Sequence, residues 1–131
     1  AGAITEALRI EPPGIMLDRY VLDDVVFGGF TIPRGSTVSM MWGAGNFDPK
    51  AFEAPFAFDP TRSHQGLTTF GGGLQICPGR FISVMLTRTL LEGLAERGMG
   101  LEPTEERGHW IPAHKMCQLS TFPVRVRRAA G

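Results

Sequence analysis

A glycine-dense segment at residues 70–79, with the sequence FGGGLQICPG, constrains the fold of this chain more than any other feature. Three consecutive glycines predict a bulged loop, because glycine adopts backbone conformations that other residues avoid. An apolar-periodic stretch follows at once, at residues 80–98. The order therefore predicts a loop that carries Cys77 and leads directly into a long helix.

Two helices are predicted. Over residues 80–98 apolar residues recur at helical spacing, and they include Phe81, Val84, Met85, Leu86, Leu90, Leu91 and Leu94. Gly98 and Gly100 predict the end of this helix. Residues 5–10 favour a short N-terminal helix, which Pro12 ends because the residue before a proline avoids the helical region.

Short β-prone runs occupy much of the remaining chain. They lie at residues 25–27, 30–32, 37–42, 118–122 and 124–126. Two glycines separate the first two runs, which is typical of a β-hairpin. Residues 46–64 carry prolines between aromatic residues, so we expect an irregular segment there with at most a short helix. The predicted fold class is therefore α+β, with mixed helices and small antiparallel sheets.

The composition is that of an ordinary soluble domain. The 131 residues are 43% apolar and 20% charged, and could bury a substantial core if the chain folds alone. Thirteen basic residues balance thirteen acidic ones, so we expect neither a nucleic acid nor an anionic membrane as a partner. No apolar run approaches the roughly 20 residues that a membrane-spanning helix needs. We therefore expect no membrane segment in this chain.

Cys77 is the main candidate ligand. A thiolate just before a helix faces unpaired N–H groups and the positive end of the helix dipole, which favour the anionic form. Gly79 allows close approach of a bulky partner to the backbone, and Phe70 is placed to cover the sulfur. The alternative interpretation is a buried, inert cysteine. Cys77 and Cys117 are the two cysteines of the chain, too few for a disulfide framework.

Two further groups of residues suggest weaker sites. Glu6 and Arg9 share one face of the N-terminal helix at i and i+3, although most such pairs are solvated surface pairs. A metal site from His109, His114 and Cys117 has a spacing unlike the usual zinc patterns, and the alternative is two surface histidines and a buried cysteine. The glycine run lacks the third glycine of a dinucleotide-binding loop.

Together, the motifs resemble the C-terminal portion of a cytochrome P450, from residue 5 nearly to the end. The haem-ligand pattern of that family, Phe-Gly-x-Gly-x-(His/Arg)-x-Cys-x-Gly, is matched at Phe70, Gly71, Gly73, Cys77 and Gly79. The Glu-x-x-Arg motif of the family corresponds to Glu6 and Arg9, and its strand pair and meander to residues 32–35, 46–49 and 58–62. The resemblance implies that residues 1–131 form the C-terminal haem-binding portion of a P450-like domain.

The resemblance also assigns roles to single residues. It implies haem b as the cofactor, with Cys77 as the axial thiolate that pushes electron density toward O–O cleavage. Arg19 corresponds to an arginine that pairs with a haem propionate, a contact suited to the planar guanidinium. Four residues are expected on the substrate side: Ile15, Met16, Lys115 and Met116. For these four, the alternative is ordinary strand packing or surface.

Two residues depart from the family pattern. Gln75 stands where the family usually has His or Arg, and its uncharged amide offers roughly half the strength of a charge-assisted bond to a propionate. Ala57 stands where many members have the arginine of Pro-x-Arg-Phe, which completes a triad with the helical Glu and Arg. Glu6 and Arg9 must therefore find another partner or be less fixed.

The long central helix of the family, with its acid–alcohol pair for proton delivery, has no counterpart in these residues. Because catalysis needs a closed, water-limited site, this piece alone should be a poor monooxygenase. One hypothesis is the haem-thiolate portion of a monooxygenase that, with upstream sequence, inserts oxygen into a small organic substrate. The alternative is a truncated, non-catalytic module that binds haem or a partner.

The enzyme hypothesis implies an electron donor such as a ferredoxin or a flavoprotein reductase. Arg80 is a candidate contact for an acidic donor on the proximal face, or else a solvated first-turn residue. Short turns and residues 58–62 look more similar to bacterial soluble members than to membrane-anchored ones. We therefore expect a cytoplasmic protein, with any anchor lying upstream.

Overall fold

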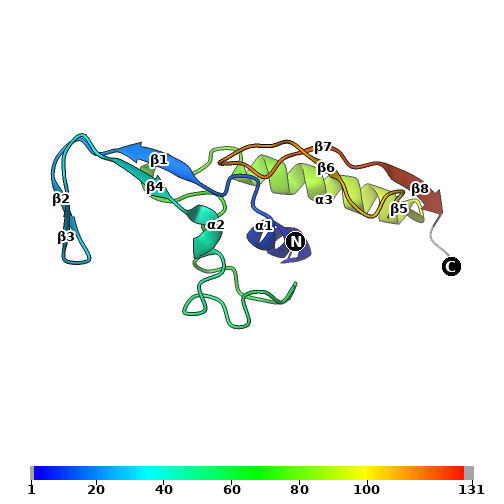
Figure 1. Ribbon diagram of the computed structural model, residues 1–131. Coiled ribbons are helices and arrows are strands. Elements are labelled where there is room, and N and C mark those ends of the chain that lie inside the picture. The colour runs from blue at the N-terminus through cyan, green and yellow to red at the C-terminus, as the bar shows by residue number, and fades with distance from the viewer. Residues whose placement is uncertain (1, 129–131) are drawn as a thin grey trace.

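Figure 1 shows the computed structural model, which describes residues 2–128. The helices are α1 (Gly2–Ile10), α2 (Trp42–Gly45) and α3 (Arg80–Glu96), with a 3-10 turn, η1 (Gly73–Gln75). The strands are β1 (Leu17–Tyr20), β2 (Val25–Phe27), β3 (Phe30–Ile32), β4 (Thr37–Met40), β5 (Met99–Pro103), β6 (His109–Trp110), β7 (Leu119–Thr121) and β8 (Val124–Arg128). The predicted α+β class is confirmed.

Within the described residues, the strands form small antiparallel pairs instead of one sheet. The pairs are β1 with β4, β2 with β3, β5 with β8, and β6 with β7. The β2–β3 hairpin projects at one end of the molecule, and β5 and β8 lie near the C-terminal end of α3 (Figure 1). The α1 helix contacts α3 near the middle of the elongated molecule (Figure 1).

The predicted hairpin forms at the two glycines. Gly28 and Gly29 have φ values of 57° and 82°, in the left-handed region that a two-residue hairpin turn requires, and Phe27 pairs with Phe30 across the turn. The strand predicted at residues 37–42 is shorter, because β1 begins at Leu17, whose partner is Met40. With no further strand to pair with, the chain turns into α2.

The α3 helix follows the cysteine loop as predicted. It ends at Glu96, two residues before the expected limit, and Gly98 leaves the helix with a φ of 60°. The chain then continues as β5, which pairs along its whole length with β8. The sequence predicted β8 in part but gave no strand for β5.

The apolar core expected for a chain that folds alone is absent from the described residues. Pro12, Val21 and Phe52 are their only buried apolar side chains, whereas Glu6, Arg9 and Asn46 are completely buried. The apolar stripe of α3 remains largely exposed. The interior of this piece is therefore a polar network, and most apolar surface faces outward.

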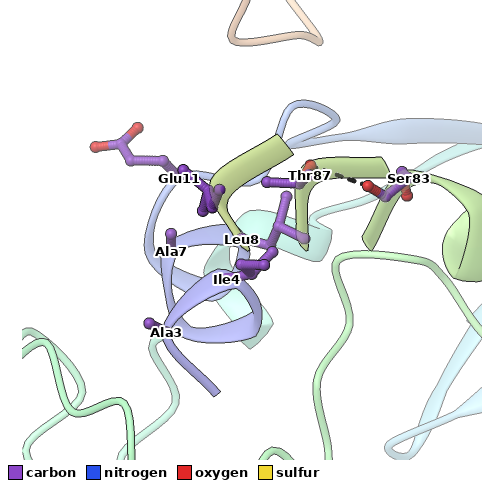
Figure 2. A pocket seen from close by; sticks show the side chains of 8 residues that line it. Ala3, Ile4, Ala7, Leu8, Glu11, Ser83 and Thr87 are labelled. Carbon is purple, nitrogen blue, oxygen red and sulfur yellow. Dashed lines mark hydrogen bonds between the residues drawn. The ribbon is translucent and has the colours of Figure 1, made fainter. Parts of the chain in front are cut away.

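An apolar cavity of about 370 Å³ separates α1 from α3. Figure 2 shows it between Ala7 and Leu8 of α1 and Ser83 and Thr87 of α3, with the Thr87 hydroxyl donating to the Ser83 carbonyl at 2.9 Å. The two helices thus leave apolar surface uncovered between them. In the described part of the chain, no helix combines the length and hydropathy needed to cross a membrane.

Candidate functional site

The loop that carries Cys77 is closed by its own backbone. The N–H of Gly71 donates to the carbonyl of Thr68 at 2.8 Å, and the N–H of Cys77 donates to the carbonyl of Phe70 at 2.9 Å. Gly71 and Gly73 have φ values of 70° and 63°, so the loop turns in a conformation that favours glycine at both positions. These are the two glycines of the Phe-Gly-x-Gly pattern.

Cys77 itself is a free, partly buried thiol. It precedes Gly79, the N-cap residue of α3, so it lies in the loop and not in the first helical turn. A Cβ at Gly79 would lie 3.8 Å from the sulfur, which means that the backbone passes beside it. Arg80 fixes this corner, because its N–H and its guanidinium Nη1 both donate to the Cys77 carbonyl, at 3.4 and 3.3 Å.

The residues between the glycines and the thiol are exposed. Leu74 is fully exposed, and Ile76 is exposed over 39% of its surface. The side chain of Gln75 forms no hydrogen bond with the described residues and faces solvent within η1. An uncovered, largely apolar surface therefore adjoins the thiol.

The Glu6–Arg9 pair is buried, which overturns the solvated-surface alternative. The guanidinium of Arg9 donates from Nε and Nη2 to the two carboxylate oxygens of Glu6, at 2.9 and 2.8 Å, and both side chains are completely inaccessible. This two-pronged geometry is the strongest arrangement available to an arginine and a carboxylate. It fixes the two residues of α1 as one unit.

The arginine that was expected at position 57 is instead Arg62, in the sequence Pro60-Thr61-Arg62, and other groups add to its contact with Glu6. Glu6 also accepts from Arg62 Nε at 3.2 Å and from the N–H of Asp59 at 3.1 Å, and it lies 3.0 Å from His64 Nε2. Arg9 donates to the backbone carbonyl of Ala57 at 3.2 Å. Of the two outcomes expected from the alanine at position 57, the structure therefore has the first: the pair is held by other residues and is not loose.

These contacts make Glu6 a stronger acid than an ordinary glutamate. The hydrogen bonds from Arg9 contribute most, and those from the Asp59 N–H and His64 add to them, whereas burial opposes the effect. Together they lower the pKa of Glu6 from 4.5 to about 2. Glu6 is thus an anion at neutral pH, at the centre of a ring of donors.

The four residues expected on the substrate side are brought together by their backbones. The carbonyl of Lys115 accepts from the N–H groups of Ile15 at 3.0 Å and Met16 at 3.4 Å, and Met116 bridges to Gly14. We call this pairing of residues 14–16 with residues 115–116 the substrate-side strip. Segments that are far apart in the sequence therefore meet here.

The side chain of Lys115 is occupied by an ion pair with Asp18. The hydrogen bond from Lys115, and then the one from Ser39, lower the pKa of Asp18. Arg19, the next residue of β1, is exposed and donates from Nη1 to the Asp18 carbonyl at 2.9 Å. Its guanidinium has no carboxylate partner among the described residues.

The weaker metal reading finds no support in the geometry. Among residues 2–128, no three His, Cys, Asp or Glu side chains are grouped so that they could hold a metal ion. His109 Nε2 instead lies 3.1 Å from the Glu105 carboxylate, and Cys117 is a free thiol.

Sequence reasoning missed three residues that stabilise the site: Asn46, Arg62 and His64. Asn46 and Arg62 lie within segments that resemble the family's meander, which was the available signal. His64 carried no signal of its own, because its partner Glu6 lies 58 positions away.

Comparison with known proteins gives consistent matches. A family model for cytochrome P450 matches residues 2–97. The 6-deoxyerythronolide B hydroxylase of Saccharopolyspora erythraea is 38% identical over 95 residues, which cover 72% of this chain and 24% of that protein. Cytochrome P450 144 of Mycobacterium tuberculosis is 34% identical over 125 residues, which cover 95% of this chain and 29% of that protein.

A solved structure shares the fold. P450BioI, in complex with an acyl carrier protein ligated to hexadec-9Z-enoic acid, has a TM-score of 0.86 at 31% identity, over 96% of this chain and 33% of that chain. The chain thus spans about a quarter to a third of the length of these relatives. Because the family model also matches more than half of its residues, the chain belongs to the cytochrome P450 family.

Proposed function

We propose that this chain supplies the haem-thiolate portion of a monooxygenase, with Cys77 as the axial ligand of haem b. The observation that carries the proposal is the free thiol of Cys77 at the end of a backbone-closed Phe-Gly-x-Gly loop, directly before α3. Cytochromes P450 hold their haem iron through a cysteine thiolate. The C-terminal portion, residues 1–131, would then act together with upstream sequence.

The residues present fit a haem. Cys77 offers a soft sulfur donor of the kind that binds haem iron. Gly79 leaves the sulfur free of a neighbouring Cβ, and the exposed Leu74 and Ile76 offer apolar contact to a flat macrocycle. Two groups suit the propionates: the guanidinium of Arg19, which has no acid partner in the described chain, and the free amide of Gln75.

When bound, the haem supplies oxygen activation, and the thiolate favours O–O cleavage. The residues of this chain would hold the ligand loop in place and orient the substrate. The hydrogen bond from the Cys77 N–H to the Phe70 carbonyl and the bonds from Arg80 to the Cys77 carbonyl fix the backbone of the residue that carries the thiol. The substrate-side strip would offer the apolar side chains of Ile15, Met16 and Met116 to a small organic substrate.

The proposed enzyme takes electrons from a ferredoxin or a flavoprotein reductase and works in the cytoplasm, as its resemblance to bacterial members suggests. Arg80 is a candidate contact for an acidic donor. Its guanidinium lies over the Phe81 ring, 4.2 Å from the centroid, and is only partly buried. A cation held in this way presents a fixed charge to a partner.

The ferrous–carbon monoxide spectrum of the complete protein tests the proposal. The wild type and Cys117→Ala, which removes the other partly buried free thiol, should show the red-shifted Soret band of a thiolate ligand. Cys77→Ala should lose that band while haem content is measured in parallel. Identical spectra from the two alanine variants would remove Cys77 from this role. Thiolate ligation without oxygen insertion into any organic substrate would favour the non-catalytic module.

A further inference from the structure

A buried carboxamide joins the start of the cysteine loop to the two N-terminal helices. The side chain of Asn46, which is completely buried, donates from Nδ2 to the Arg9 carbonyl at 3.1 Å and to Thr69 Oγ1 at 2.8 Å. Its Oδ1 accepts from the N–H of Thr68 at 2.9 Å and lies 2.7 Å from the Thr68 hydroxyl. Every donor and acceptor of the amide is therefore used.

The two threonines carry these contacts onward. Thr69 donates from its hydroxyl to the carbonyl of Leu8 in α1 at 2.8 Å, and the Thr68 hydroxyl lies 2.6 Å from the carbonyl of Trp42 in α2. A Cβ at Gly45 would lie 3.1 Å from the same Thr68 hydroxyl, so Thr68 sits tightly against α2. The segment is fixed from both sides.

The fixed segment is where the cysteine loop begins. The Thr68 carbonyl accepts from the N–H of Gly71, and the Phe70 carbonyl accepts from the N–H of Cys77. Asn46 is therefore linked to the thiol-bearing residue by two threonines and two backbone hydrogen bonds. A shift of Thr68 and Thr69 would move both ends of the loop.

We propose that Asn46 is the positioning residue of the Cys77 loop, and that its carboxamide sets the placement of the thiol relative to α1. The consequence for iron ligation rests on the proposed function, whereas the placement of the loop does not. The role requires an amide because one side of the group must donate and the other must accept. An aspartate has the same shape but would place an oxygen against the Arg9 carbonyl.

Hydrogen exchange of the complete, haem-loaded protein tests the placement. In Asn46→Asp, amide exchange over residues 66–79 should rise roughly tenfold, as expected for the loss of one or two buried hydrogen bonds, while exchange over α3 stays unchanged. Asp48→Asn is the matched control, since Asp48 is exposed two positions away and its carboxylate accepts, among the described residues, only from the Lys50 N–H. It should exchange like the wild type.

A second pair of variants keeps the proposal testable if Asn46→Asp does not fold. Thr69→Val removes the hydroxyl that joins Asn46 to Leu8 and should raise exchange in the same segment, whereas Thr69→Ser retains the hydroxyl and should restore protection. Wild-type exchange in both Asn46→Asp and Thr69→Val would overturn the proposal. A rise in exchange spread equally over the whole protein would also overturn the proposal. It would mean that Asn46 stabilises the fold as a whole and does not position the loop in particular.

The ferrous–carbon monoxide spectrum separates this inference from the function on which its ligation part rests. Asn46→Asp should convert part of the thiolate band to the band of a protonated thiol at unchanged haem content, and Asp48→Asn should not. If the wild type lacks the thiolate band, the proposed function fails, and the exchange measurements alone decide the role of Asn46.

Discussion

At the scale of single residues, local signals were readable from the sequence and distant partners were not. Cys77 was identified because its glycine loop and its helix adjoin it in the chain. The burial of Glu6 could not be predicted, since its partners Arg62 and His64 lie 56 and 58 positions away. The i,i+3 spacing indicated only that Glu6 and Arg9 share a helix face, which exposed and buried pairs have in common.

Glu6→Gln should destabilise the complete protein strongly. The substitution keeps the shape of the side chain but leaves the buried Arg9 charge uncompensated, and breaking a buried pair in this way costs about 3–5 kcal/mol. Glu92→Gln is the matched control, because Glu92 pairs with Arg88 on the exposed face of α3 and should cost less than about 1 kcal/mol. Urea unfolding measures both, and equal effects would contradict the assignment of Glu6 as a buried anchor.

At the scale of elements, the glycine run shows at which positions of the motif the backbone conformation requires glycine. Gly71 and Gly73 occupy the left-handed region, whereas Gly72 between them is extended, with a φ of −156°. The pattern Phe-Gly-x-Gly thus requires glycine where the backbone turns and leaves the intervening position free. The family pattern already separates Gly71 and Gly73 from Gly72, and the backbone conformation supplies the physical reason.

Gly73→Ala should therefore loosen the loop more than Gly72→Ala. Neither position has an atom within 4 Å of an added Cβ, so the difference is one of backbone conformation alone. A left-handed alanine costs about 1–2 kcal/mol, while an extended alanine carries no such penalty. The fraction of thiolate-ligated haem and the urea midpoint should both fall in Gly73→Ala. A larger loss in Gly72→Ala would show that contacts, and not conformation, control this loop.

The strands that could not be predicted from the sequence are those that form only by pairing with a distant segment. The β2–β3 hairpin and α3 have local signals: a glycine turn, and an apolar period with a glycine stop. The β5 strand gains its strand character from β8, and the two-residue β6 from β7. Such strands have too few residues for a periodic pattern, and the partner that stabilises them lies elsewhere in the chain.

At the scale of the whole molecule, a polar network occupies much of the interior of this piece. Glu6, Arg9 and Asn46 are completely buried, together with Phe52 and the less deeply buried Val21 and Pro12, while the apolar side chains of α3 face outward. The average composition predicted an apolar core. It could not reveal that polar residues are buried while the apolar stripe of α3 is exposed, because hydropathy does not specify which surface such a stripe packs against.

Acid should weaken the protein through Glu6. Its pKa is lowered in the folded state from 4.5 to about 2, so its contribution is complete above pH 4.5 and is lost as the pH falls toward 2. The free energy of unfolding of the wild type should therefore fall faster in this interval than that of Glu6→Gln, which cannot titrate. Asp18 also has a lowered pKa, but no Glu6 effect contributes to it, so it cancels in the comparison. The pKa of Asp59 is lowered chiefly by Thr61 and is raised by the Glu6 charge, so Glu6→Gln should lower it further. Parallel pH profiles would show that Glu6 titrates normally.

The substrate-side strip has a consequence for the order of assembly. Lys115 reaches across 97 positions to pair with Asp18, so closing this contact requires the whole segment between the two residues to be present. A ribosome delivers the cysteine loop and its asparagine anchor well before it delivers Lys115. The strip can therefore form only on a nascent chain whose thiol has already emerged, and the β6–β7 and β5–β8 pairs, which need residues beyond Met116, close later still.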